Sequence, residues 1–126
     1  MPDRVADASV LGAIAFGESR GEEAVSLLES ADLYEPSLLA YELSSIARSK
    51  IREDPEQRDS ILRGLELMLD WDFAWMNIDQ LQVVDLALET GLSTYDASYL
   101  YVARTLGLPL VTFDRRLQAV ASRSGT

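Results

Sequence analysis

The sequence contains no cysteine and no histidine. Without cysteine there is no disulfide, no thiolate zinc site and no cysteine nucleophile. Without histidine the chain lacks the commonest general base, every Ser-His triad and every histidine metal ligand. Lysine occurs only once, as Lys50, so nearly all of the basic residues are arginine. The chemistry that remains is that of carboxylates, hydroxyls and guanidinium groups.

Long apolar runs are also missing, and no segment approaches the roughly 18 residues that a membrane span requires. The first residues, MPDRVADAS, have no basic region followed by an apolar one, which argues against a secretory signal. We therefore expect a cytoplasmic protein with no membrane contact. With 126 residues, of which 48% are hydrophobic, the chain is expected to form a single domain over residues 1–126.

Positive charge is scarce. The net charge is −10, from 21 acidic and 11 basic residues, so the overall field does not attract nucleic acid. Solubility is the simplest explanation of such a balance. The alternative is that some of the acidic residues cluster to hold a hard cation or a basic partner peptide.

Short apolar segments alternate with amphipathic ones. Strands are expected at 4–6, 32–35, 73–77 and 108–113, and the last is the clearest because it is apolar and bounded by turn residues. Helix-start signals stand between them: Ser9, a Ser19–Glu22 capping box, Ser37, Asp54-Pro55, Asp79, Ser93 or Thr94, and Asp114. Gly91 and Gly107 are expected to end helices. This alternation predicts an α/β fold with a short, mainly parallel sheet flanked by helices.

Two acidic residues lie within apolar helical segments. Glu42 shares a helix face with Leu38 and Ile46, where an unpaired buried carboxylate costs several kcal/mol. Asp96 begins a helix that is apolar nearly all round. The alternatives are that Glu42 reaches solvent or an arginine, and that Asp96 is a first-turn acid favoured by the helix dipole.

Two more acidic residues, Asp7 and Asp114, follow the first and the last predicted strand. Either can be explained as a cap of the next helix. In parallel α/β sheets, however, ligands bind beyond the carboxyl ends of the strands, so these carboxylates would meet if the two strands are neighbours. Asp96 and Glu42 could complete a cluster. Four carboxylates in one pocket repel each other unless a cation neutralises them, and oxygen ligands alone suit Mg²⁺ or Mn²⁺. Such a site suggests metal-dependent hydrolysis of phosphate esters.

The order and spacing of these residues resemble the PIN-domain family, and specifically the VapC-type toxin ribonucleases. The resemblance covers nearly the whole chain and is carried by four segments: DAS with Asp7, PSLLAYELSSIAR with Glu42, TYDASYLYVA with Asp96, and LVTFDRRL with Asp114. Each segment alone is weakly specific. Together they imply a PIN-like α/β/α sandwich, and no acidic position of the pattern is missing.

The resemblance implies an endoribonuclease that depends on Mg²⁺ or Mn²⁺. Asp7, Glu42, Asp96 and Asp114 would form its acidic pocket, with Asp7 and Asp96 as the preferred metal ligands. Glu42 and Asp114 would help to coordinate the metal or would orient the attacking water. Ser9 and Thr112 would supply hydroxyls that hold the carboxylates or contact phosphate. Their alternative roles are a helix cap for Ser9 and a β-branched strand residue for Thr112.

The resemblance also implies partners. These are RNA as the substrate, a second copy of the chain in a homodimer, and a small antitoxin that brings a basic segment toward the acidic pocket. Arg115 and Arg116 are candidate phosphate contacts because they stand in a first helical turn, where the dipole disfavours cations. Further possible surfaces are a basic patch of Arg48, Lys50 and Arg52, and the apolar segment 65–69, which has more apolar groups than one helix face needs. The aromatic segment 71–76 is expected to join the core, and its alternative roles are base stacking or a dimer surface.

Other functions remain open. A response-regulator receiver would need a lysine after a late strand, whereas Lys50 lies within a predicted helix. A haloacid-dehalogenase-like phosphatase would need a second aspartate where Ser9 stands. A housekeeping RNA-processing nuclease and a PIN-like module that only binds a partner are the remaining alternatives.

Overall fold

The computed structural model describes residues 3–123, and residues 1, 2 and 124–126 lie outside this range. Four strands alternate with helices along the chain. The elements are β1 (Asp3–Ala6), α1 (Ala8–Ala15), α2 (Gly21–Leu28), β2 (Asp32–Pro36), α3 (Leu38–Glu53), the 3₁₀ turn η1 (Pro55–Gln57), α4 (Arg58–Leu69), β3 (Ala74–Met76), α5 (Gln80–Thr90), α6 (Thr94–Leu106), β4 (Leu110–Val111) and α7 (Arg115–Arg123). Between residues 3 and 123, no helix has the length and apolar character needed to span a membrane.

All strand pairs of the sheet are parallel, in the order β3-β2-β1-β4. The chain moves from β1 to β2 and β3 in one direction and then returns to place β4 on the other side of β1. Val5 pairs with Leu110 and Ala6 with Val111. The strand order therefore reverses between β1 and β4, which is where open α/β sheets form their binding crevices. The predicted fold class is confirmed.

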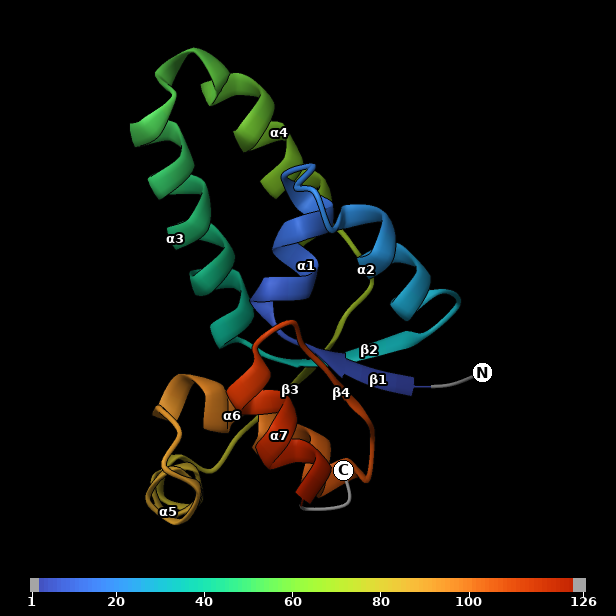
Figure 1. Ribbon diagram of the computed structural model, residues 1–126, viewed down its shortest axis with the longest axis vertical. Coiled ribbons are helices and arrows are strands. Elements are labelled where there is room, and N and C mark those ends of the chain that lie inside the picture. The colour runs from blue at the N-terminus through green and yellow to red at the C-terminus, as the bar shows by residue number, and fades with distance from the viewer. Residues whose placement is uncertain (1–2, 124–126) are drawn as a thin grey trace.

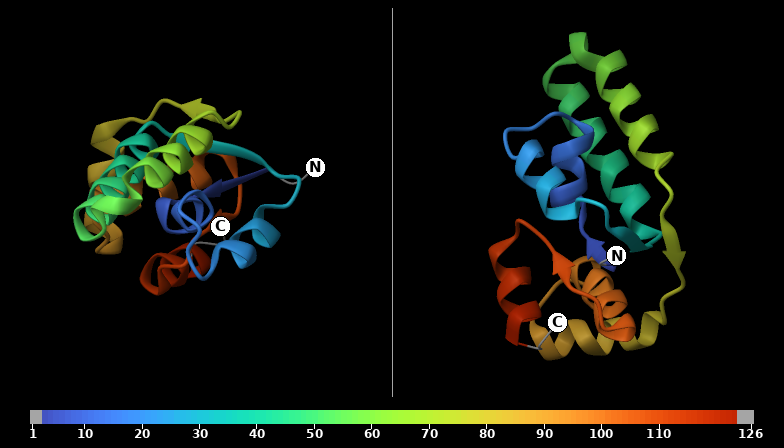
Figure 2. Two further views of the ribbon diagram at one scale, coloured as in Figure 1. Left: turned by 90° about the horizontal axis from the view of Figure 1, so that it is seen from above. Right: turned by 90° about the vertical axis from the view of Figure 1, so that its right-hand side faces the viewer.

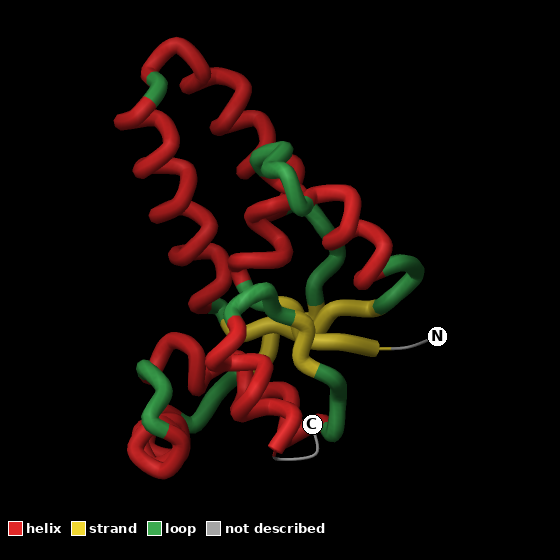
Figure 3. The backbone as a smooth tube through the Cα atoms, in the orientation of Figure 1, coloured by secondary structure: helices red, strands yellow, loops and turns green. Residues whose placement is uncertain are grey.

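The helices form two layers around the sheet. Helices α1–α4 lie on one side and α5–α7 on the other (Figure 1). The side view in Figure 2 keeps the same separation, with α3 and α4 reaching furthest from the sheet. Figure 3 shows how small the strand layer is beside the helices. The arrangement is an α/β/α sandwich.

Helix α6 is buried on both sides, as its apolar sequence predicted. Tyr99 and Val102 belong to a core cluster that also contains Val5 of β1 and residues of α1 to α3. Ala97 and Leu100 belong to a second cluster, formed with α5 and α7. The start of α6, which carries Asp96, is thus fixed from two directions.

Most predicted helix ends are confirmed. The Asp79 side chain caps α5, the Ser93 side chain caps α6, and Gly91 and Gly107 end these helices in the left-handed conformation that glycine adopts without strain. The Ser9 cap is wrong, because Asp7 is the N-cap of α1 and Ser9 lies within the helix.

Two other local predictions also differ from the structure. The Ser19–Glu22 capping box is wrong, since α2 begins after Arg20 with no side-chain cap. The last strand is shorter than the predicted range 108–113. Its partner β1 ends at Ala6, where Asp7 turns the chain into α1, so only Leu110 and Val111 are paired.

Candidate functional site

Asp7 lies at the carboxyl end of β1 and is almost fully buried, at 5% exposure. Its Oδ1 accepts hydrogen bonds from the Ser9 hydroxyl at 2.6 Å and from the Ser9 N–H at 3.1 Å. Its Oδ2 accepts from the Thr112 hydroxyl at 2.6 Å. Burial is the main cause that raises the pKa of Asp7, and these hydrogen bonds partly offset it. The carboxylate is therefore rigidly held while its charge is poorly compensated.

Thr112 connects Asp7 to the start of α7. While its hydroxyl donates to Asp7, the same oxygen accepts the N–H of Asp114 at 3.0 Å. Asp114 is exposed, and its Oδ1 caps α7 by accepting the Leu117 N–H at 2.8 Å. Asp114 is thus a helix cap, as one sequence interpretation held. Its Oδ2 makes no hydrogen bond within residues 3–123 and so can face a ligand.

Glu42 projects from α3 and is half-buried. Its Oε1 accepts a 2.6 Å hydrogen bond from the hydroxyl of Tyr99, a residue of α6 with only 1% exposure. Burial raises the pKa of Glu42, the Tyr99 hydrogen bond lowers it, and the charges of Asp96 and Asp7 raise it again. The partner of Glu42 is therefore a tyrosine rather than the arginine considered above.

Asp96 lies in the first turn of α6. Burial is the largest cause that raises its pKa, the charges of Asp114 and Asp7 raise it further, and Arg116 opposes them. Arg116 also donates a hydrogen bond to the backbone carbonyl of Gly91. Asp96 thus experiences the negative charges of two other candidate residues, together with one nearby cation.

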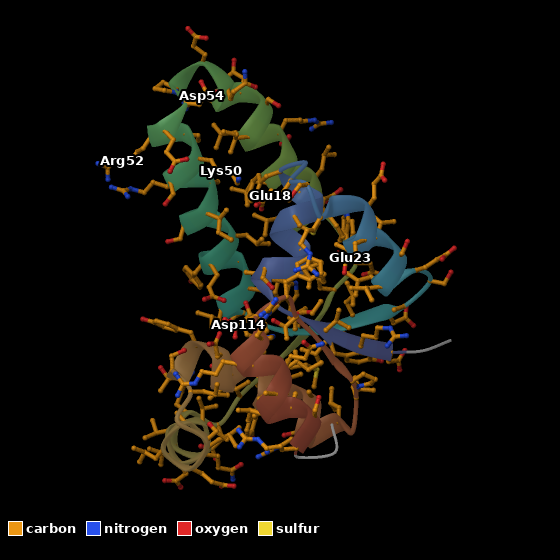
Figure 4. All side chains as sticks on the ribbon, in the orientation of Figure 1. Glu18, Glu23, Lys50, Arg52, Asp54 and Asp114 are labelled. Atoms are coloured by element: carbon orange, nitrogen blue, oxygen red, sulfur yellow. The ribbon has the colours of Figure 1, made fainter. Side chains whose placement is uncertain are left out.

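The four carboxylates come from four elements and are electrostatically coupled through Asp7 and Asp96. In Figure 4, Asp114 lies at the level of the sheet, between the two helical layers. Within residues 3–123, no three acidic side chains lie close enough to form a ready-made metal cage. The donor set still suits Mg²⁺, which keeps several waters and binds proteins through one or two carboxylates.

Beside Glu42 the surface is hollowed. A cavity of about 390 Å³ is lined by Leu38, Tyr41, Glu42, Ser45, Ile46, Tyr95 and Ala8. Tyr41 and Tyr95 are both exposed. Aromatic rings that line the same cavity as a carboxylate offer both stacking and cation–π contacts to a bound molecule.

Two residues coupled to the site were missed by the sequence analysis. Tyr99 could have been found, because a buried tyrosine on an apolar helix needs a partner for its hydroxyl. Glu35 of β2 is completely buried, and its Oε2 accepts the N–H of Ala6 at 2.8 Å. Burial raises the pKa of Glu35 well above its usual value, and the charge of Asp7 adds to this effect. A glutamate before a proline gave no sequence signal of such burial.

The basic residues of α3 are not grouped as the sequence analysis predicted. Figure 4 shows Lys50 directed toward Glu18, whereas Arg52 points away from the rest of the molecule. Lys50 Nζ lies 3.7 Å from Glu18 Oε2. Arg48, Lys50 and Arg52 therefore do not form one patch. Arg115 and Arg116 are both exposed at the start of α7.

The aromatic segment is split between core and surface. Phe73 is buried and Met76 packs against the core, while Trp71 and Trp75 remain exposed. The apolar segment 65–69 is divided in the same way, with Met68 buried and Leu67 half exposed. A core role for the aromatic segment therefore holds for Phe73 and Met76 but not for the two tryptophans.

Comparison with known proteins gives consistent results. Residues 4–123 match the family described as PIN domain. Ribonuclease VapC3 of Pyrobaculum aerophilum is 30% identical over 118 residues, which is 90% of each chain. Exonuclease VapC9 of the same organism is 58% identical over 38 residues, which is 30% of this chain and 29% of that one. The crystal structure of PAE2754 from P. aerophilum superposes with a TM-score of 0.75 at 31% identity, covering 94% of this chain and 86% of that one.

Proposed function

The chain belongs to the PIN-domain family, and from this premise we propose that it is an endoribonuclease that depends on Mg²⁺ or Mn²⁺, with residues 1–126 as a single PIN domain. The observation that carries the proposal is the coupling of its carboxylates. Burial is the largest cause that raises the pKa values of Asp7, Glu42 and Asp96, and for Glu42 and Asp96 neighbouring acidic charges raise them further. A divalent cation would remove this repulsion.

In this proposal Asp7 and Asp96 hold the metal, and Glu42 and Asp114 assist or orient the attacking water. An ion held by these residues would supply an activated water and would offset the charge that builds on the phosphoryl oxygens. Ser9 and Thr112 keep both oxygens of Asp7 in place. Tyr99 fixes Glu42, whose raised pKa suits it to take up a proton from water.

RNA has to approach a protein of net charge −10. Arg115 and Arg116 are the proposed phosphate contacts, since both are exposed beside Asp114. Binding that depends on a few local cations and a metal is weak and strongly salt-sensitive. Tight binding that does not change with salt would contradict this part of the proposal.

A cleavage assay on circular single-stranded RNA tests the activity, and it also separates an endonuclease from an exonuclease, because a circle has no end. Wild-type protein should linearise the circle with Mg²⁺ or Mn²⁺ but not with a chelator. The Asp96→Asn variant should lose about 100-fold or more of the rate, the scale of one group acting on the reacting atoms. Asp59→Asn is the matched control, because Asp59 is exposed on α4 and forms an ion pair with the neighbouring Arg58.

Equal cleavage by the Asp96→Asn variant and the wild type would overturn the site assignment. Cleavage of linear RNA alone would favour an exonuclease. If the carboxylates proved dispensable for both cleavage and metal binding, the alternative of a module that only binds a partner would gain support.

A housekeeping nuclease would share the chemistry, and a neighbouring reading frame for a small DNA-binding protein would favour the toxin.

The toxin proposal includes a small antitoxin that presents a basic segment to the acidic pocket. Opposite charges across an interface favour rapid association and correct partner choice. The exposed rings of Tyr41 and Tyr95 beside Glu42 would suit an arginine from such a segment.

We also propose a homodimer through α5. Leu81, Val84 and Leu88 lie on one side of this helix and are 80%, 45% and 79% exposed. Light scattering after gel filtration should show that Leu88→Lys gives a monomer while Leu67→Lys on α4 leaves the dimer intact. The reverse result would place the interface on α4, at the apolar segment 65–69.

A further inference from the structure

A groove of about 630 Å³ begins at the candidate site and runs between α3 and the segment that joins α1 to α2. It is lined by Ala8, Ser9, Ala13, Glu18, Ser19, Arg20, Ser45, Ile46, Ser49, Lys50, Glu53 and Phe113. Ser9 and Phe113 form its end nearest to Asp7. The Phe113 N–H donates a 3.0 Å hydrogen bond to the Ser9 hydroxyl, which in turn donates to Asp7. The groove is thus one hydrogen bond away from a proposed metal ligand at Ser9 and two at Phe113.

A guanidinium lies over an aromatic ring of this wall. The Arg20 Cζ is 3.7 Å from the centre of the Phe113 ring and lies over its face. Glu23 holds the guanidinium in place by accepting two hydrogen bonds, from Nε and Nη2 of Arg20, each 2.9 Å long. The Arg20 side chain lines the groove and is still 51% exposed, so it remains accessible to a bound molecule.

The composition of the groove favours binding of a nucleobase rather than of a phosphate group. Its two cations, Arg20 and Lys50, are matched by two acids, Glu18 and Glu53, so it carries no excess positive charge. Both cations are also already engaged, Arg20 by Glu23 and Lys50 by Glu18. What the groove offers is a flat delocalised surface and several serine hydroxyls. Single-stranded RNA is recognised by stacking on aromatic rings and guanidinium planes, with hydrogen bonds to base edges.

We propose that the Arg20–Phe113 stack is a nucleobase platform that binds the base of a nucleotide next to the cleaved bond. This proposal rests on the proposed ribonuclease function. Arg20 stacks the base, Phe113 supports the guanidinium from behind, and Glu23 fixes its orientation. The platform supplies RNA affinity that does not require net positive charge, which the chain as a whole lacks.

The test uses a short single-stranded RNA of mixed sequence in which an abasic ribose replaces one nucleotide at a time. An abasic ribose at one position beside the cleaved bond should lower the wild-type kcat/KM by about 5- to 100-fold, the range for losing one stacked base. The Arg20→Ala variant should cleave the intact RNA more slowly than the wild type. An abasic ribose at that position should not lower its kcat/KM further. Phe113→Leu, which keeps an apolar side chain without a ring, should behave in the same way.

Arg63→Ala is the matched control. Arg63 forms an exposed ion pair with Glu66 three residues later, as Arg20 does with Glu23, but it lies on α4 outside the groove. It should keep the wild-type response to the abasic position. The proposal is overturned if Arg20→Ala retains the abasic penalty, or if Arg63→Ala loses it as well.

A binding measurement distinguishes failure of the platform from failure of the nuclease proposal. The same RNA carries 2-aminopurine at one position at a time, with Ca²⁺ present. Quenching at one position by the wild type and by Arg63→Ala, but not by Arg20→Ala, would support the platform even if no RNA is cleaved. Equal fluorescence with the wild type and Arg20→Ala at every position would refute it, whether or not the protein is a nuclease.

Discussion

The Thr112 hydroxyl donates a 2.6 Å hydrogen bond to Oδ2 of Asp7, a residue 105 positions earlier in the chain. The same oxygen accepts the N–H of Asp114. One hydroxyl therefore sets the distance between the acidic ends of β1 and β4. This contact exists because the two strands are parallel neighbours that stop at the same level of the sheet.

Replacement of Thr112 should damage both the site and the fold. Thr112→Val keeps the shape but leaves Oδ2 of the buried Asp7 without its donor and the Asp114 N–H without its acceptor. We expect a loss of about 1–3 kcal/mol in the free energy of unfolding by urea. RNA cleavage should fall by about 10- to 100-fold, as is usual when a group that supports a metal ligand is removed. Thr112→Ser, which retains the hydroxyl, should recover most of both. A harmless Val together with a damaging Ser would show that the methyl group matters instead.

Tyr99→Phe should change the pH dependence of cleavage. The Tyr99 hydrogen bond lowers the pKa of Glu42, so its removal raises that pKa further above its usual value. If Glu42 acts as a base, the acidic limb of the kcat/KM profile should move to higher pH, with a smaller effect on the alkaline plateau. Tyr101→Phe, on the same helix, is the control. A uniform loss of rate with an unmoved limb would assign Tyr99 a purely structural role.

Without metal, the protein should become less stable as the pH rises. Asp7, Glu35, Glu42 and Asp96 all have folded-state pKa values above their usual values of 3.8 or 4.5. The folded state therefore binds more protons than the unfolded chain, and stability falls as the pH rises above about 4. Scanning calorimetry in a chelator should give a lower Tm at pH 7.5 than at pH 5.5. Mg²⁺ or Mn²⁺ should raise the Tm more at pH 7.5, and a metal effect that is greater at pH 5.5 would contradict the proposed site.

The Glu35→Gln variant tests how much the buried carboxyl of Glu35 contributes to this pH dependence, apart from the carboxylates of the candidate site. The amide oxygen can still accept the Ala6 N–H, but the side chain can no longer ionise. The folded-state pKa of Glu35 is raised well above 4.5, so above pH 4.5 the unfolded chain loses a proton that the folded wild type keeps. This difference lowers the free energy of unfolding by up to about 1.4 kcal/mol per pH unit above that value. The variant should be close to the wild type at pH 5 and more stable at pH 8 in urea unfolding. Parallel pH profiles for the two proteins would refute this account.

Local sequence signals accounted for much of the fold. The caps at Asp79 and Ser93 and the helix ends at Gly91 and Gly107 are confirmed because each depends only on residues a turn away. The alternation of short apolar strands with helices was sufficient to predict the α/β class. Ser9 was wrongly predicted as a cap because Asp7 and Ser9, two positions apart, are both residues that can cap a helix, and the structure uses Asp7.

The sequence by itself determined the chemistry. It excluded thiol and imidazole groups, supplied a surplus of carboxylates, and placed four of them at strand ends or on apolar helices, where charge is costly. Only the tertiary structure decided how these groups meet. The strand order β3-β2-β1-β4 makes β1 and β4 neighbours, and the packing of α6 against α3 brings Tyr99 to Glu42. Pairings between residues 57 or 105 positions apart depend on how whole elements pack, and no local pattern of amino acids encodes that packing.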